Sequence, residues 1–362
     1  MRGPHDQPGR RSGRPGDVHG FSHVPAPAAR RARRSGVSRN RISFFERPYP
    51  DANSVLIHGK RPTLVDTGFG SGVHELESWL TAQGVCAARL ALIVNTHHHT
   101  DHVGGNHHLQ THHGTPIAAH PWEGRAVNRR DPEACLGRWL TQPVQAYHVT
   151  QFLRDGDTLN AGDSTWHVLH TPGHSLGHIV LHREGVGITG DALMTGDIGW
   201  LNFHRDGLNS AERALESLDR LAALNLEVAY PGHGPVITDV PSTINAARTR
   251  TEKMLRNPMK AAWHGTKRIF AFALMSEGPM TEQDLHAYQA RNPWITDYAR
   301  DVFHVTPTEF FTQLLGEMTR SGAARWEGDH LIITGPYRQA TPGWARTPTN
   351  VSDWPPAPAE WT

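Results

Sequence analysis

Short apolar runs alternate with amphipathic segments of helical length between residues 42 and 258. Residues 54–59 (SVLIHG) and 62–68 (PTLVDTG) are typical of a strand pair joined by a tight turn. Residues 91–96 (ALIVNT) predict a further strand, which follows a helix expected near 72–83. Later apolar runs predict four more strands, at 166–171, 178–183, 186–190 and 226–232.

A longer helix is expected between the last two of these strands. Leucines recur there at helical spacing, and Asn209 stands where an N-cap is expected. The alternation of strands with helices predicts a mixed α/β layered domain over residues 42–258.

From residue 259 the pattern becomes helix-rich. Helices are expected at 259–276, 281–290 and 307–321, and residues 325–334 (RWEGDHLIIT) predict a hairpin that turns at Gly328. Three helices followed by a two-stranded hairpin predict a small winged-helix-like domain over residues 259–335. Residues 260–335 hold seven Lys and Arg against nine Asp and Glu, which favours a packing or lid role over DNA-groove binding.

Both ends of the chain lack apolar periodicity. Residues 1–41 hold ten arginines against Asp6 and Asp17, and they predict a disordered basic extension. Three interpretations of it stay open: an arm that touches nucleic acid, an organelle transit peptide, or an upstream segment that is not translated because translation begins near Val37. Residues 336–362 are Pro-rich and predict a disordered tail.

Charge and composition narrow the function further. The net charge is +1 overall, and removing the +8 of residues 1–41 leaves −7, which argues against a broad phosphate-binding surface. No apolar run approaches the roughly 20 residues of a membrane helix, so a cytoplasmic protein without membrane partners is expected. Cys86 and Cys135 are expected to be reduced. The 26 histidines direct attention to metal ligands.

The strongest chemical signal is the segment 96–102 (THHHTDH), directly after a predicted strand. His97 and His99, two residues apart in an extended turn, can direct two imidazoles at one point, while Asp101 and His102 can reach a second point nearby. The other interpretation is surface decoration, which is the expectation for four nearby histidines: His107, His108, His112 and His113.

Three further fragments each follow a predicted strand and pair a metal-competent residue with a glycine. They are residues 171–174 (TPGH), 189–191 (TGD) and 231–234 (PGHG). Each alone could be an ordinary turn. Together they predict ligands that converge on one edge of a layered fold.

With LVDTG at residues 64–68, these motifs stand in the order found in the metallo-β-lactamase-fold hydrolases, which the sequence resembles over about residues 42–258. The resemblance implies a four-layer αβ/βα sandwich with a dinuclear metal centre. It implies that His97, His99 and His174 hold one metal ion, that Asp101, His102 and His233 hold the other, and that Asp191 bridges them. It also implies that Asp66 orients a ligand imidazole without binding metal.

The chemistry expected of such a centre is hydrolysis by a metal-bound hydroxide, with Asp101 and Asp191 as catalytic residues that hold or move its proton. Two divalent ions are expected; zinc is favoured, and iron and manganese are alternatives. The segments THHHTDHVGGN and TPGHSLGHI are most similar to the glyoxalase II branch, which implies a small acyl substrate: a thioester, ester or lactone. The aspartate at position 191 disfavours lactam hydrolysis, because β-lactamases of this fold usually carry cysteine or serine there.

Two other functions stay open. The first is an endoribonuclease or other phosphodiester hydrolase of the same fold. The second is a metal-binding winged-helix DNA-binding regulator, which predicts a basic recognition helix that the sequence lacks. The sequence predicts no oligomeric state. Among secondary candidates, His98 is expected to point away from the metals, His178 is either a support for the ligands or structural, and Trp200, Phe203 and His204 are candidates for the pocket wall.

Overall fold

The computed structural model describes residues 41–341, 344 and 354–357, so the predicted extension lies outside the described residues except for Arg41. Six strands form the first sheet, in sequence order. The first three run antiparallel, and each later neighbour is parallel. They are β1 (Ile42–Phe45), β2 (Ser54–Ile57), β3 (Thr63–Val65), β4 (Leu92–Val94), β5 (Ile117–Ala119) and β6 (Gln151–Phe152).

Five strands form the second sheet, in the order β11-β10-β9-β8-β7. All neighbours are antiparallel except β10 and β11, which are parallel. The strands are β7 (Thr158–Ala161), β8 (Ser164–His170), β9 (Ile179–Arg183), β10 (Val186–Gly190) and β11 (Val228–Pro231).

Alternation along the strands divides the apolar side chains between two cores. Val55 and Ile57 of β2 pack between the two sheets against Val168 and Ile188, whereas Leu56 of the same strand faces the helices on the outer side. Because both faces are covered, these strands are continuously apolar. This explains why runs such as SVLI predicted strands without polar alternation.

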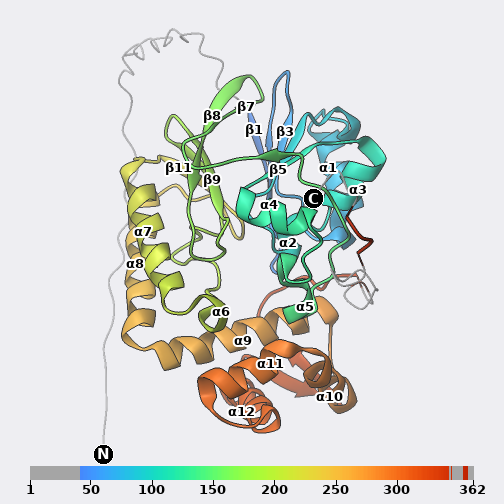
Figure 1. Cartoon of the computed structure of the whole chain (residues 1–362), viewed down its shortest axis with the longest axis vertical. Helices are drawn as coiled ribbons and strands as arrows, with labels where there is room; N and C mark the ends of the chain where they lie inside the picture. The colour runs from blue at the N-terminus through green and yellow to red at the C-terminus, as the bar shows by residue number, and fades with distance from the viewer. Residues whose placement is uncertain (1–40, 342–343, 345–353, 358–362) are drawn as a thin grey trace, which may run out of the picture. The chain divides into compact units, whose positions relative to one another are not determined.

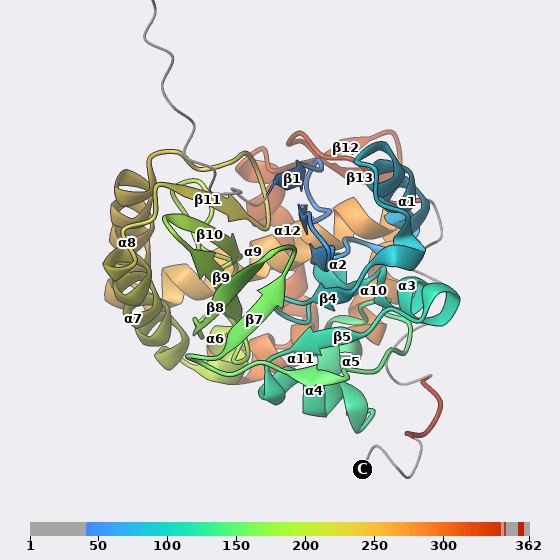
Figure 2. The same cartoon turned by 90° about the horizontal axis from the view of Figure 1, so that it is seen from above.

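Helices cover the outer face of each sheet, so the predicted four-layer αβ/βα sandwich is confirmed (Figures 1 and 2). On the first sheet lie α1 (Val73–Ala82), α2 (Thr100–Val103), α3 (Asn106–His113) and α4 (Pro121–Asn128). On the second lie α7 (Asn209–Ala223) and α8 (Val240–Arg256). Shorter turns complete this part: 3₁₀ turns at Gly70–Gly72, Ala87–Arg89 and Ala134–Leu136, with α5 (Gly137–Leu140) and α6 (Phe203–Asp206).

One detail of the prediction was wrong. Asn209 is the first residue of α7 rather than its cap, and the capping position is Leu208, which supplies no side-chain hydrogen bond. Ser210 instead donates its hydroxyl to the carbonyl of Gly207, 2.7 Å away.

The C-terminal segments match the predicted helices and hairpin. They are α9 (Pro258–Glu277), α10 (Glu282–Arg291), α12 (Pro307–Arg320), β12 (Ala324–Glu327) and β13 (His330–Ile333), with α11 (Pro293–Tyr298) and a π-helical turn (Ala299–Phe303) not predicted. They share an apolar core that includes Phe270, Trp294 and Phe310. The winged-helix arrangement and the boundary at residue 259 stay predictions.

Trp139 of α5 joins this helical core to the sandwich. It is buried, stacks with Trp200 at 6.3 Å between ring centroids, and donates its indole N–H to Asp297 Oδ2 at 2.8 Å. The helical region therefore packs against the edge of the sandwich that carries the loops after β4 and β10.

Two tryptophans of the predicted tail lie within the described residues and contact the sandwich. Trp354 is buried in the core beneath the first sheet and donates its indole N–H to the carbonyl of Val144 at 2.5 Å. Trp344 packs edge-on against Phe69, with 4.8 Å between the ring centroids.

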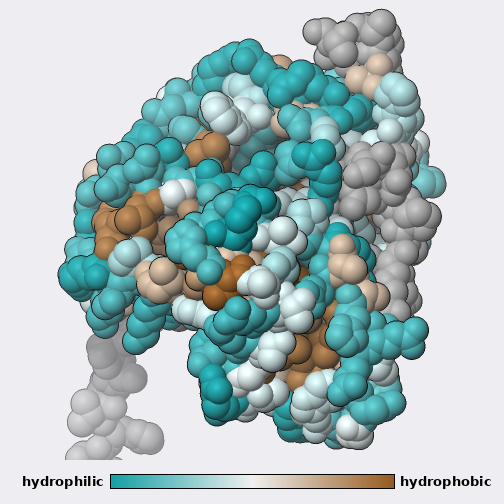
Figure 3. All heavy atoms as spheres, turned by 60° about the horizontal axis from the view of Figure 1, so that its bottom comes forward, coloured by the Kyte–Doolittle hydropathy of each residue, from teal (hydrophilic) through white to brown (hydrophobic). Residues whose placement is uncertain are grey.

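The face of the molecule seen in Figure 3 is mostly hydrophilic, with apolar patches between the polar side chains. Among the described helices, none combines the length and apolarity needed to cross a membrane.

Candidate metal centre

Every predicted ligand lies in a loop, or at the start of a helix, that follows a strand. His97 and His99 follow β4, His174 follows β8, Asp191 follows β10, and His233 follows β11. These strands end at one edge of the sandwich, which brings together side chains that are up to 136 positions apart in the sequence (from 97 to 233).

Three imidazoles form a first cluster. His97 Nε2 lies 3.1 Å from His99 Nδ1 and 3.1 Å from His174 Nε2, and His99 Nδ1 lies 2.8 Å from His174 Nε2. The three nitrogens therefore face one point, which is the arrangement of three histidine ligands around a metal ion.

The hydrogen bonds of the Nδ1 atoms of His97 and His174 show which nitrogen of each ring carries the proton. His174 Nδ1 lies 2.5 Å from the carbonyl oxygen of Trp200, which only accepts, so Nδ1 carries the proton. Thr96 Oγ1 donates to Asp66 Oδ2 at 2.7 Å, so it accepts from His97 Nδ1 at 3.1 Å. The Nε2 atoms of His97 and His174 thus present lone pairs to each other, which is unfavourable unless a cation lies between them.

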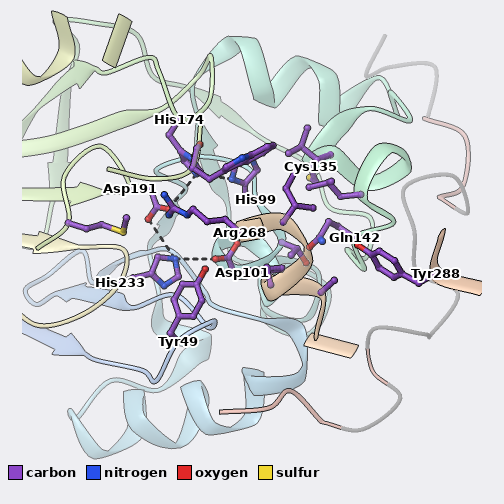
Figure 4. Close-up of a pocket in the computed structure, with 18 residues that line it drawn as sticks. Tyr49, His99, Asp101, Cys135, Gln142, His174, Asp191, His233, Arg268 and Tyr288 are labelled. Carbon is purple, nitrogen blue, oxygen red and sulfur yellow. Dashed lines mark hydrogen bonds and ion pairs between the residues drawn. The ribbon is translucent and has the colours of Figure 1, made fainter. Parts of the chain in front are cut away.

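A second cluster lies beside the first (Figure 4). Asp101 Oδ2 is 3.1 Å from His233 Nε2 and 3.7 Å from His102 Nε2. Asp191 lies between the clusters, with Oδ1 3.4 Å from His102 Nε2 and Oδ2 3.4 Å from His174 Nε2. One carboxylate therefore reaches both groups of ligands, as a bridging residue must.

Two buried polar atoms in these clusters lack a hydrogen-bond partner among the described residues, and a metal ion would supply one. Within the part of the chain that the structure describes, His102 Nε2 and Asp191 Oδ1 have no hydrogen-bond partner. Buried polar atoms are normally paired, so both positions are suited to a metal ion. The fold and these clusters imply binding of divalent metal ions.

The pKa shifts of the clustered histidines also fit a bound metal ion. Burial lowers the pKa of His97 and His99 well below the usual histidine value, so both are neutral, as metal ligands must be. Burial alone would lower the pKa of His102. The carboxylates of Asp101, Asp66 and Asp191 raise that pKa by more, so it lies well above the usual histidine value. Three carboxylates around one buried imidazole supply the negative charge that a cation neutralises.

Neighbouring side chains hold the ligands in place. Asp66 Oδ2 accepts from His102 Nδ1 at 2.8 Å. His178 Nε2 accepts from the backbone N–H of Asp191 at 3.1 Å, so this histidine supports a ligand. His98 accepts from the backbone N–H of Cys135 at 3.3 Å and points away from the cluster, as expected.

Two glycines make room for the ligands. A Cβ at Gly199 would lie 2.5 Å from His174 Cγ, and a Cβ at Gly232 would collide with Asp191 Oδ1. In the sequence, Gly232 is marked only as the neighbour of His233, and no local pattern marks Gly199, which lies in a loop.

A cavity opens onto Asp101, His174 and Asp191 (Figure 4). Its apolar wall combines the segment between β5 and β6 with α9: Leu136, Leu140, Ile269, Phe272 and Ala273. Tyr49 and Arg268 add polar groups near the ligands, and neither was predicted, because only tertiary packing brings them there. Trp200 lines the cavity, whereas His204 instead bonds Asp301 at 2.9 Å.

A second, more polar hollow reaches the same ligands from another side. It shares His99, His174, Leu136 and Trp200 with the first cavity. Its other lining residues include Trp122, which is 63% exposed, and Arg125. Of the predicted ligands, His99 and His174 therefore line both the apolar cavity and the polar hollow.

Comparison with known proteins gives three further findings. Residues 49–233 match the model of the metallo-beta-lactamase superfamily. The chain is 32% identical over 213 residues to the acyl-coenzyme A thioesterase MBLAC2 of Homo sapiens, covering 50% of this chain and 72% of that protein. It is 39% identical over 138 residues to a hydroxyacylglutathione hydrolase of Gloeobacter violaceus, covering 38% of this chain and 46% of that protein.

A solved structure is also similar. It is a metallo-beta-lactamase family protein from Thermus thermophilus, with a TM-score of 0.50 and 25% identity. The match covers 81% of this chain and 98% of that one, and so extends beyond the residues that the family model matches.

Proposed function

The chain belongs to the metallo-beta-lactamase superfamily and is a metal-dependent hydrolase, and from this premise we propose that its substrate is a small acyl compound: a thioester, an ester or a lactone. The observation that carries the proposal is the apolar cavity that opens directly onto Asp101 and Asp191. An apolar wall of this kind suits an acyl group, whereas a phosphodiester backbone would meet a single cationic side chain, Arg268, among the described residues that line the cavity.

Seven residues would hold two divalent ions, most readily zinc. His97, His99 and His174 would hold one ion, Asp101, His102 and His233 the other, and Asp191 would contact both. Bound divalent ions supply a water whose pKa is lowered toward about 7 and a Lewis acid for the acyl oxygen.

The protein's own groups would orient the reactants and move the proton. In thioester hydrolysis the water oxygen bonds to the acyl carbon, the carbon–sulfur bond breaks, and the water's proton ends on the departing thiol. Asp101 and Asp191 border the cavity and are placed to hold that proton.

The two openings suggest how an acyl substrate would lie. The acyl part would enter the apolar cavity against Phe272 and Ala273, and the departing group would extend into the polar hollow past Trp200. The relatives named as acyl-coenzyme A thioesterase and hydroxyacylglutathione hydrolase act on substrates of this two-part kind, which supports the proposal.

The test is an elemental analysis of metal content together with assays on the same batch of protein. The assays use a panel of substrates in parallel: acyl thioesters of one thiol with increasing acyl length, an ester, a lactone and an oligoribonucleotide. Turnover of an acyl substrate with at least two metal ions per chain is expected. Cleavage of RNA alone, with both ions bound, would replace the proposal with phosphodiester hydrolysis.

A further inference from the structure

Four side chains able to bind metal gather away from the catalytic centre, on two helices that cover the first sheet. His74 and Glu77 lie three positions apart on α1, so they share one face of that helix. His108 and His113 belong to α3 and meet Glu77 from the other side. The sequence predicts His108 and His113 as surface decoration, and the structure brings both imidazoles to one carboxylate.

The donor atoms are close together. Glu77 Oε1 lies 2.7 Å from His113 Nε2 and 3.1 Å from His108 Nε2, while Glu77 Oε2 lies 3.2 Å from His74 Nδ1. Donor atoms of His74, Glu77 and His108 all lie within 4.8 Å of one another. These spacings resemble those among the ligands of the catalytic centre, where donor atoms lie 2.8 to 3.7 Å apart.

The side chains of this cluster are positioned by their helices and are also accessible to solvent. The side chains of Glu77, His108 and His113 are 24%, 19% and 22% exposed, whereas that of His74 is 82% exposed. The ring of His112 stacks on His108 with 4.2 Å between the centroids, which limits rotation of that imidazole. Three donors are therefore placed by two helices, and the fourth can close over an ion from solvent.

We propose that His74, Glu77, His108 and His113 form a separate binding site for one divalent transition-metal ion, with zinc as the physiological occupant. Three imidazole nitrogens and one carboxylate oxygen make the four-donor set that zinc accepts in tetrahedral geometry, and nickel and copper accept the same nitrogens. Neutral imidazoles can present lone pairs at these atoms by tautomer exchange, so an ion can replace the hydrogen bonds to Glu77.

An ion here would join α1 to α3. The helix α3 follows directly on α2, which begins with Thr100 and carries Asp101 and His102. The site would therefore stabilise the segment that positions two catalytic ligands, without contributing an atom to the reaction.

Zinc binding by full-length protein without a histidine tag tests this. The protein is equilibrated with excess Zn²⁺, unbound and weakly bound ions are removed, and the metal content is then measured. Wild-type protein is expected to hold about one ion per chain more than the His74→Ala/His108→Ala variant, and more than Glu77→Gln, which keeps the shape of the side chain. Both variants are expected to keep their catalytic ions and their activity.

The matched control is His286→Ala, which removes an exposed histidine from α10 and leaves metal content unchanged. A second measurement follows thermal unfolding as Zn²⁺ is added to protein whose catalytic ions are already bound. A further rise in Tm is expected for wild type and for His286→Ala only. Equal metal content and equal Tm shifts in wild type and in both cluster variants would show a hydrogen-bonded cluster only and would overturn the proposal.

Discussion

Asp66 Oδ2 lies 2.8 Å from His102 Nδ1 and 2.7 Å from Thr96 Oγ1, so one carboxylate oxygen orients an imidazole in each ligand cluster. It holds His102 directly and His97 through the Thr96 hydroxyl. Its other oxygen accepts from the backbone N–H of Thr96 at 2.8 Å. The two clusters thus share a single support, and its loss is expected to disturb both.

Asp66→Asn is the sharpest test of that support. Asp66 has a φ of +57°, which asparagine tolerates as well as aspartate, so the backbone is expected to be unchanged. Loss of the anionic acceptor is expected to weaken metal binding about 10–100-fold and to lower activity with it. Competition with a chelator measures the affinity, and unchanged affinity would remove the supporting role.

Asp191→Ala is expected to lower metal content and turnover together, because its two oxygens face different clusters. Activity is expected to fall roughly 100-fold or more. Asp219→Ala, which removes an exposed carboxylate on α7, serves as the control and should keep both. Full activity in the Asp191 variant would contradict the bridging assignment.

Gly232→Ala tests close packing at the ligands. The added methyl group would collide with Asp191 Oδ1 and come within 2.7 Å of His102 Cε1, so one ligand must move. A loss of activity of about tenfold or more is expected, with less metal bound. Gly316→Ala adds the same group on α12, where its nearest neighbour is 3.9 Å away, and should have no effect on either quantity.

Phe272→Ala tests the acyl wall. Shortening this side chain is expected to lower kcat/KM for long acyl chains roughly tenfold relative to the shortest one, because apolar contact is lost only for the longer chains. Phe303→Ala makes the same change in the helical core outside the cavity. If both variants change chain-length preference equally, the cavity does not hold the acyl group.

Thiol reactivity tests the environment of the two cysteines. Both are free; Cys86 is exposed, while Cys135 is buried and borders the cavity. Burial raises the pKa of Cys135, so it stays a thiol and reacts slowly. At pH 8, Ellman's reagent is expected to detect about one thiol in native protein and about two in denaturant. Rapid reaction of both in native protein would show that the cavity wall opens.

The sequence predicted most strands and the ligand order because both depend on local signals. Runs such as SVLI and ALIV are apolar on both faces, and His174, Asp191 and His233 each stand beside a glycine after a strand. The helix α8 was missed because its buried face is carried only by Val240, Ile244, Ala247 and Thr251, which makes a weak apolar pattern in a polar segment.

Other features depended on tertiary structure. Tyr49 and Arg268 meet at one cavity although more than 200 positions separate them, and no local pattern marks either residue. The contact of Trp354 with Val144 is equally distant in sequence. The cluster at Glu77 was missed because its histidines come from two helices whose packing the pattern did not predict.

The predicted ligands and part of the apolar cavity wall come from different stretches of the chain. The ligands stand in loops of the sandwich or in α2, whereas Ile269, Phe272 and Ala273 belong to α9, which follows the sandwich. Substitutions in that helix can change the shape of the cavity without touching an atom that binds metal. Natural selection could therefore change the substrates of such a protein while its hydrolytic chemistry is preserved, and divergence among relatives with the same ligands is expected to concentrate in α9.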